Sequence, residues 1–206
     1  MRGKALEAPM VQVFPSFLQP LFVLLVIGVA AAAVISLYGF VRGSPPLSAF
    51  QPLAAALCIY ALLMIAGSVT SRERRLPFGT DLCFDDWCAT VTSLQNAPAS
   101  SGSRVVTANV RVSSIAKRVT QRGSDPRLYL IDAGGTWYSA APSPSDPTLG
   151  AAIKPGESFT SRVHAAVPAQ AEIVAVRIWE GGFIDPLVPF DEESPFHRKT
   201  FLVRDR

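Results

Sequence analysis

The first third of the chain almost lacks charge. Between Glu7 and Arg72 the only charged side chain is Arg42, which divides this stretch into two apolar segments, 21–41 and 47–69. Each has about 20 residues, the length that an α-helix needs to cross the hydrocarbon core of a bilayer. Neither segment contains Asp, Glu, Lys, Arg or His, which argues against a proton relay, an ion path or a transporter. We therefore interpret the two segments as a membrane anchor.

The connection between the two segments is short and turn-like. Residues 42–46 read Arg-Gly-Ser-Pro-Pro, and glycine, serine and proline favour turns over helix. The sequence therefore predicts a transmembrane hairpin of two helices within residues 17–70, with both ends on the same side of the membrane. A short lead over 1–16 precedes this hairpin, and a linker over 71–82 follows it.

Motifs of several catalytic and binding classes are also absent from the sequence. No GxSxG string marks a nucleophile elbow, and no glycine-rich phosphate loop precedes a helix. The chain has 2 histidines, His164 and His197, far apart in sequence. Basic residues are scattered beyond the second apolar segment, without the patch that is typical of nucleic-acid binding. We expect no enzyme activity, no cofactor, no small-molecule substrate and no nucleic-acid partner.

Beyond residue 83 the hydrophobic pattern changes to an alternation of period two, which is typical of half-buried strands. It is clearest over 104–115, where one predicted face consists of Val106, Ala108, Val110 and Val112. Gly134 and Gly135 suit a hairpin turn after the apolar run 127–132. About seven such strands with turns between them predict an antiparallel β-sandwich over 83–206. The other segments with this alternation are 87–94, 159–165, 172–180 and 198–204.

The most specific local string is Cys83-Phe-Asp-Asp-Trp-Cys88. Four intervening residues make a small loop that a disulfide can close, and this is the favoured interpretation. Two free thiols, or metal or redox chemistry, are alternatives. The spacing is not Cys-x-x-Cys, and a structural zinc site normally needs four ligands. The third cysteine, Cys58, lies inside the second apolar segment, where it is expected to act as a small hydrophobic residue.

Five carboxylates in two loops form a candidate site for a hard cation such as calcium, provided that the loops meet. Neither loop has the spaced Asp/Asn pattern of a calcium-binding loop, so solvated turn carboxylates are the favoured interpretation and no metal is expected. The candidate ligands are Asp85, Asp86, Asp191, Glu192 and Glu193.

An apolar stretch over 181–190 contains two prolines, Pro186 and Pro189, which keep it out of regular structure. If its large side chains are exposed, they form a contact patch for a partner or for the membrane surface. The favoured alternative is that they bury one end of the sandwich. The candidate contact residues are Phe183, Ile184, Leu187 and Phe190.

Several phrases of the chain beyond residue 83 together resemble one family. They are FDDWCATV (84–91), VRVSSIAKRV (110–119), RLYLIDAG (127–134), KPGESF (154–159) and DEESPFHRKT (191–200). They resemble uncharacterised bacterial membrane-anchored proteins with an immunoglobulin-like β-sandwich of unknown function. The resemblance covers most of residues 83–203 and implies this fold and an envelope setting, but no catalytic residue. A second membrane span before the domain is a departure from the family pattern.

Features of the sequence conflict over which side of the membrane holds the C-terminal domain. The positive-inside rule places both ends in the cytoplasm, because Arg72, Arg74 and Arg75 follow the second segment while Arg42 stands alone in the turn. Paired cysteines and the family resemblance favour an extracytoplasmic domain, and we adopt that interpretation.

The expected function follows from these features. We predict an integral protein of the bacterial plasma membrane whose partners are the lipid bilayer and a second protein, with a binding or scaffolding role. A metal-binding or thiol-redox accessory domain centred on Cys83 and Cys88, and a small subunit of a larger membrane complex, are the alternatives.

Overall fold

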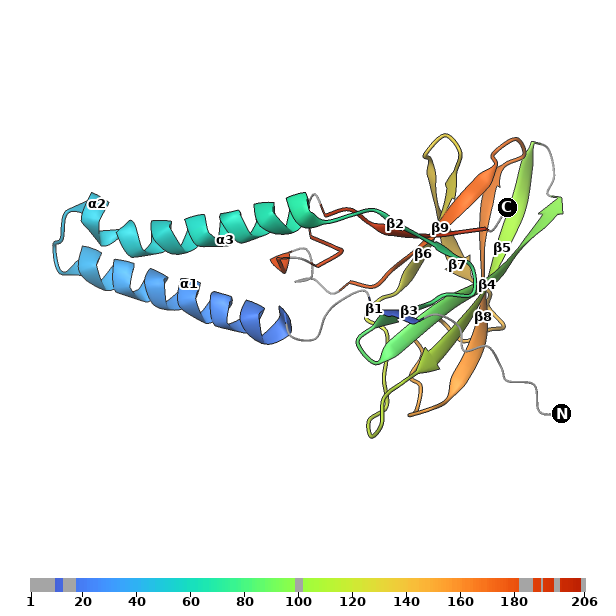
Figure 1. The fold of residues 1–206 in the computed structure, drawn as a ribbon, viewed down its shortest axis with the longest axis horizontal. Coiled ribbons are helices and arrows are strands. Elements are labelled where there is room, and N and C mark those ends of the chain that lie inside the picture. The colour runs from blue at the N-terminus through green and yellow to red at the C-terminus, as the bar shows by residue number, and fades with distance from the viewer. Residues whose placement is uncertain are drawn as a thin grey trace. The chain divides into compact units, whose positions relative to one another are not determined.

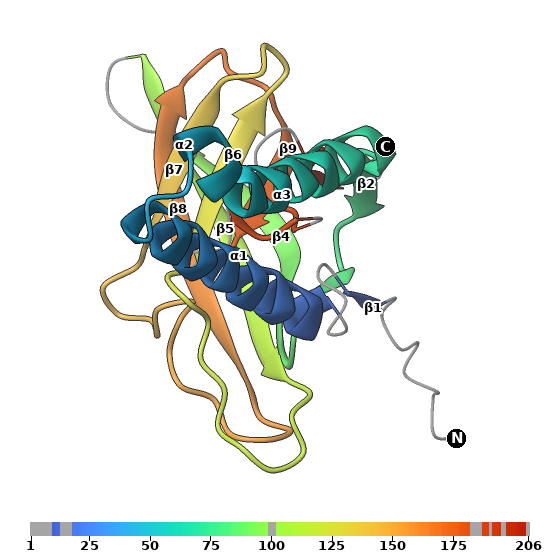
Figure 2. The ribbon, with the colours of Figure 1, turned by 90° about the vertical axis from the view of Figure 1, so that its left-hand side faces the viewer.

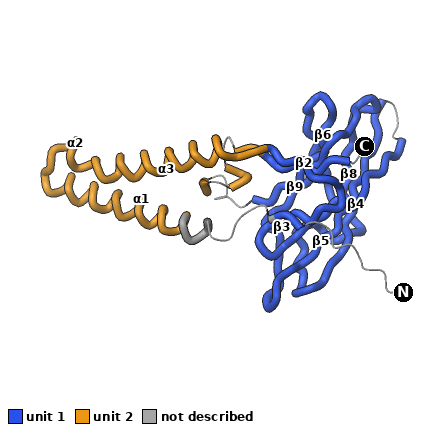
Figure 3. The backbone as a smooth tube through the Cα atoms, in the orientation of Figure 1, with its two compact units in different colours: residues 1–14, 73–182, 199–206 blue, residues 15–72, 183–198 orange. Residues whose placement is uncertain are grey.

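The computed structural model describes residues 10–12, 18–98, 102–181, 187–189, 191–194 and 197–204. The chain divides into two compact units, which Figure 3 distinguishes by colour. The β unit comprises residues 1–14, 73–182 and 199–206, and the helical unit comprises 15–72 and 183–198.

The helical unit contains α1 (Leu18–Val41), the short α2 (Pro46–Ala49) and α3 (Gln51–Thr70). Figures 1 and 2 show α1 and α3 side by side and antiparallel. The spans Phe22–Val41 and Gln51–Thr70 are long and apolar enough to cross a membrane. Their large apolar side chains are mostly exposed, whereas a helix of a soluble protein buries one apolar stripe.

The second long helix begins at Gln51, four residues later than the predicted segment 47–69. Pro52 is the reason, because a proline has no backbone N–H and its ring clashes with the carbonyl four residues earlier. Proline is tolerated in the first turn of a helix, and Pro52 occupies that position in α3. The chain therefore starts a new helix after the single turn of α2.

A C-terminal segment belongs to the helical unit. The Tyr60 hydroxyl of α3 donates a hydrogen bond to the Leu187 carbonyl (2.6 Å), and the Arg198 N–H donates one to Ser71 Oγ (3.0 Å). Val188 and Ser194, between these two contacts, are buried. Residues 183–198 are therefore grouped with the helices, although they lie within the range 83–206 that was predicted as the sandwich domain.

The strands of the β unit form two layers that one strand connects (Figure 1). One layer has the order β1-β3-β4-β5-β8, and the other has the order β7-β6-β9-β10-β2. Strand β7 pairs with β6 through most of its length, while its last two residues, Ala141 and Pro142, pair with β8. The result is a curled, β-sandwich-like sheet. The bounds of its strands are β1 (Met10–Gln12), β2 (Arg74–Pro77), β3 (Asp81–Phe84), β4 (Trp87–Pro98), β5 (Ser103–Ser114), β6 (Arg127–Asp132), β7 (Trp137–Pro142), β8 (Ser158–Pro168), β9 (Ile173–Trp179) and β10 (Thr200–Val203).

The strand content differs from the prediction in number and direction. About seven antiparallel strands were expected, whereas the described residues form ten, and the pairs β1–β3 and β10–β2 are parallel. Parallel neighbours need a long connection between them, and β1 and β2 reach their partners only after long stretches of chain. The predicted linker 71–82 contains β2 and the start of β3, which are each four residues long and show too little alternation to reveal a strand.

A single turn connects the two layers on the side away from β7. The Thr80 N–H donates to the Pro77 carbonyl (3.2 Å), and Gly79 has φ +89°, as a type II turn requires at its third position. Within this turn, the Phe78 N–H donates to Val203 of β10 (3.0 Å) and the Gly79 N–H donates to Val91 of β4 (2.9 Å). The backbone of this turn therefore ties both layers together.

The core lies between the layers and follows the alternation that the sequence predicts. Val106, Ala108, Val110 and Val112 of β5 are all fully buried. Leu128 and Leu130 of β6 and Val176 and Ile178 of β9 face them from the other layer. The predicted hairpin around Gly134 and Gly135 is also confirmed, as the β6–β7 pair.

Two valines of β9 provide a matched test of this core. Val176 is 0% exposed and Val174, two residues before it, is 39% exposed. Val176→Ala removes two buried methyl groups, so we expect a loss of about 2 kcal/mol in the free energy of unfolding. Val174→Ala should cost well under half of that. Thermal or urea unfolding of the two variants measures the difference, and equal losses would contradict the assignment of the core.

Candidate functional site

A covalent corner connects β3 and β4. Cys83 and Cys88 stand directly opposite each other on these strands, with Cα atoms 4.0 Å apart, and they form a disulfide. Asp85 and Asp86 make the two-residue turn between the strands, and Asp85 has φ +57°. The predicted disulfide is thus present, and both of its cysteines are fully buried.

Trp87 packs the inner side of this corner. Its side chain is fully buried, and its ring lies 5.6 Å from that of Phe84 between centroids. Gly123 approaches so closely that an added Cβ would lie 3.1 Å from the Trp87 indole. The corner therefore fixes a neighbouring loop as well as its own two strands.

Burial of the disulfide predicts a specific pattern of thiol labelling. Only Cys58 is free, and it is exposed on α3, so a small apolar alkylating reagent that enters detergent should, with a mild reductant, modify one cysteine of the folded chain. Reductant with denaturant should give three modified cysteines. Mass spectrometry of the intact chain counts them. Three modified cysteines without denaturant would show an accessible, reducible pair.

The carboxylates proposed as cation ligands fall in different units. Asp85 and Asp86 belong to the β unit, whereas Asp191, Glu192 and Glu193 belong to the helical unit. The Asp191 carboxylate accepts the Glu193 N–H (2.6 Å), a local turn contact. Among the described residues, no group of three His, Cys, Asp or Glu side chains is arranged to hold a metal ion.

The apolar contact candidates are described only in part. Phe183, Ile184 and Phe190 lie outside the described residues. Leu187 is 50% exposed, and its carbonyl accepts the Tyr60 hydrogen bond within the helical unit. The two interpretations of this stretch, a contact patch and a cover for one end of the sandwich, both stay predictions.

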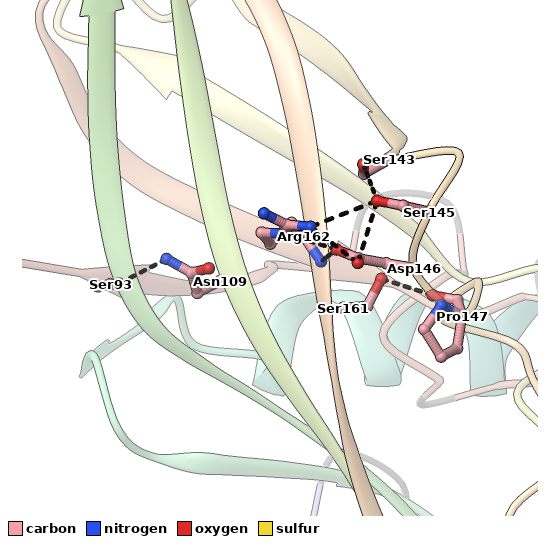
Figure 4. Close-up of polar contacts among 8 residues, drawn as sticks. All are labelled: Ser93, Asn109, Ser143, Ser145, Asp146, Pro147, Ser161 and Arg162. Atoms are coloured by element: carbon pink, nitrogen blue, oxygen red, sulfur yellow. Dashed lines mark hydrogen bonds and ion pairs between the residues drawn. The ribbon is translucent and has the colours of Figure 1, made fainter.

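A polar cluster outside the predicted sites joins strand β8 to the loop that follows β7 (Figure 4). The Asp146 carboxylate accepts hydrogen bonds from the Arg162 backbone N–H (3.0 Å) and from its guanidinium (2.7 and 3.0 Å). Ser161 Oγ donates to the Pro147 carbonyl (2.7 Å) in the same loop. Since loop and strand groups satisfy each other, this cluster is a structural clamp.

The clamp predicts a pH effect with a definite sign. Hydrogen bonding to Arg162 holds the pKa of Asp146 below its ordinary value of 3.8. A carboxyl whose pKa is lowered by folding adds stability above that ordinary value, and the contribution is lost as the pH falls through the folded-state pKa. Melting temperatures from about pH 5 to about pH 2 should therefore fall less steeply for Asp146→Asn than for the wild type. Parallel curves would contradict a role for the ionised carboxylate.

A cluster of aromatic rings and one arginine lies on the outer face of the second layer. Leu128, Leu130, Val176 and Leu202, which neighbour members of this cluster along the chain, point into the core. Because successive side chains of a strand point to opposite faces, the cluster points away from the core. The cluster, here called the aromatic face, consists of Tyr129 of β6, Trp137 of β7, Arg177 of β9 and Phe201 of β10.

The rings of the aromatic face contact one another in tilted or edge-on arrangements. The Trp137 ring lies 5.6 Å from that of Tyr129 and 6.2 Å from that of Phe201. The Arg177 guanidinium lies 5.5 Å from the centre of the Trp137 ring. Arg177 is only 5% exposed, whereas Trp137 is 44% exposed, so a large aromatic surface rests on a fixed cation.

Sequence reasoning missed the aromatic face. The alternation shows that Tyr129 and Arg177 point away from Leu128 and Val176, but it cannot show that they are neighbours. The register of β6 with β9 pairs Tyr129 with Arg177, and that of β6 with β7 pairs Ile131 with Trp137. Trp, Tyr and Arg are the residues most enriched at the energetic centres of protein interfaces.

Comparisons with known proteins give fold-level similarity only. No protein-family model matches the chain, and no curated protein matches it. An uncharacterised β-sandwich protein from Clostridium difficile 630 has 14% identity and a TM-score of 0.42, over 66% of this chain and 96% of its own. MPT63, a secreted protein from Mycobacterium tuberculosis, has 22% identity and a TM-score of 0.41, over 54% of this chain and 100% of its own.

A third solved structure, an ApaG protein from Pseudomonas aeruginosa, has 21% identity and a TM-score of 0.31 over 47% of this chain and 97% of its own. All three scores are below 0.5, so no functional argument rests on these proteins. The description of the fold as β-sandwich-like rests on the strand pairing.

Proposed function

We propose that this chain is a membrane-anchored, non-enzymatic β-sandwich module of the bacterial envelope that binds a protein partner through its aromatic face. The two helices form a transmembrane hairpin, and the sandwich belongs to the immunoglobulin-like group, in keeping with the family resemblance. The observation that most favours partner binding is an exposed Trp137 on a buried Arg177.

The apolar surface of the helices supports anchoring in a bilayer. Leu24, Val34, Leu62 and Val69 are each more than half exposed, and the spans Phe22–Val41 and Gln51–Thr70 contain no Asp, Glu, Lys or Arg. Such a surface is stable in lipid and unstable in water. Only residues 71–73 separate the end of α3 from the start of β2, so the anchor is joined to the β unit by a short stretch of chain.

The disulfide supports an extracytoplasmic position for the β unit. Disulfides form and persist in oxidising compartments and are rare in the cytoplasm. Cys83 and Cys88 are fully buried, as expected for a structural pair and not for a catalytic one, which needs an accessible thiolate. These features favour the binding module over a thiol-redox accessory domain.

Binding without catalysis is the chemistry that suits the aromatic face. An exposed indole loses little conformational entropy on contact because Tyr129 and Phe201 already pack against it. The guanidinium of Arg177 is held beneath the Trp137 ring and needs no rearrangement to support a partner.

Site-specific photocrosslinking in cells tests the proposal. A photoreactive phenylalanine analogue at Trp137 should give a discrete crosslinked protein, and Arg177→Ala should reduce it, since the aromatic ring at position 137 loses the cation that supports it. The matched control is the same analogue at Thr160, an exposed residue of β8 in the other layer. No adduct at Trp137, or the same adducts at both positions, would overturn the assignment of the aromatic face.

Anchoring and sidedness need a separate measurement. The chain should remain in the membrane fraction after alkaline carbonate extraction, and alkaline phosphatase fused to Arg206 should be active, because that enzyme folds only after export. A stable but inactive fusion would place the β unit in the cytoplasm and contradict the envelope part of the proposal.

A further inference from the structure

A basic loop between β5 and β6 has no role in the core or in the aromatic face. It spans residues 115–122 and contains three cations, Lys117, Arg118 and Arg122, and no acidic residue. All three cations are exposed. In the described part of the chain, no side chain pairs with any of them.

Backbone contacts hold both ends of the basic loop. At its start, the Ile115 N–H donates to the Asp86 carbonyl (3.0 Å) at the disulfide corner. At its end, Gln121 and Ile153 exchange two backbone hydrogen bonds of 2.8 and 2.9 Å. Gly123 then packs on Trp87. The loop is therefore attached to the rest of the β unit at both of its ends.

The middle of the basic loop combines charge with exposed aliphatic surface. Val119 is 60% exposed, and Ile115 is also exposed, while Ala116 between them is buried. Residues 117–120 are all exposed. An aliphatic side chain flanked by unpaired cations suits a surface that offers negative charge with apolar groups beneath it, as an anionic lipid interface does.

Nearby acidic groups do not pair with the loop cations. The Asp86 carboxylate accepts a long hydrogen bond from Gln121 Nε2 (3.5 Å), and Asp125 pairs with Arg127 (2.6 Å). Asp85 is exposed in the turn beside Asp86. The three cations therefore remain available to an external anion.

We propose that the basic loop binds anionic phospholipid headgroups, with Lys117, Arg118 and Arg122 contacting phosphates and Val119 entering the interface. This inference rests on the proposed membrane anchoring. A single-stranded nucleic acid is a poorer fit, because the loop has no aromatic side chain on which a base could stack.

The test places an environment-sensitive dye at the tip of the loop in the full-length chain. Cys58→Ser removes the one free thiol, and Val119→Cys supplies the labelling site under non-reducing conditions that preserve the disulfide. The chain is reconstituted in nanodiscs of phosphatidylcholine alone, or of phosphatidylcholine with phosphatidylglycerol. The expected result is a blue-shifted emission, quenched by spin-labelled lipid, only with phosphatidylglycerol and lost at high salt.

Charge and site controls make the result specific. Lys117→Gln, Arg118→Gln and Arg122→Gln together should abolish the lipid-dependent shift, while the same dye at Thr160→Cys should give none. Emission at residue 119 that is identical in both nanodiscs would overturn the inference. So would an equally large blue shift when heparin, a polyanion, is added to the phosphatidylcholine nanodiscs. If the chain fails to enter nanodiscs, anchoring is wrong; phosphatidylglycerol vesicles added to the labelled chain in solution then test the loop alone, with the same two outcomes.

Discussion

The covalent corner of Cys83, Cys88 and Trp87 is the constraint on which much of the β unit depends. The disulfide joins β3 to β4 directly, and the indole fills the space behind it. The loop after β5 is attached to this corner through Asp86, and Gly123 is small because the Trp87 ring occupies the space that a side chain would need. One buried aromatic ring and one short covalent loop thus position a hairpin and the basic loop beside it.

The two connections between the layers of the β unit determine where the aromatic face lies. Strand β7 connects the layers on one side, and the turn at Gly79 connects them on the other. Between these two connections β6, β9 and β10 lie in a register that gathers Tyr129, Arg177 and Phe201 beneath or beside the Trp137 ring. The same alternation that builds the core therefore also assembles the candidate contact surface, since each inward residue has an outward neighbour.

The two units differ in which apolar side chains they bury. The β unit encloses valines and leucines between its layers, as folding in water requires. The helical unit leaves large apolar side chains exposed around both α1 and α3, and the buried residues in the described parts of its helices are small, namely Ala32, Ser36, Ala49 and Gly67. Small residues at a helix contact and large ones facing outward are typical of helices that pack in lipid. This contrast supports a division of the chain into anchor and binding module.

The sequence by itself determined the features that depend on local pattern. The two apolar helices follow from the absence of charge, the buried face of β5 from its alternation, the β6–β7 hairpin from two glycines, and the Cys83–Cys88 pair from its spacing. Tertiary structure decided what depends on register and on distant contacts. Strand β2 is too short to show a pattern, and Leu187 contacts Tyr60 across a long separation in sequence. The aromatic face needed the pairing of four strands, because alternation tells which way a side chain points but not which side chain lies next to it.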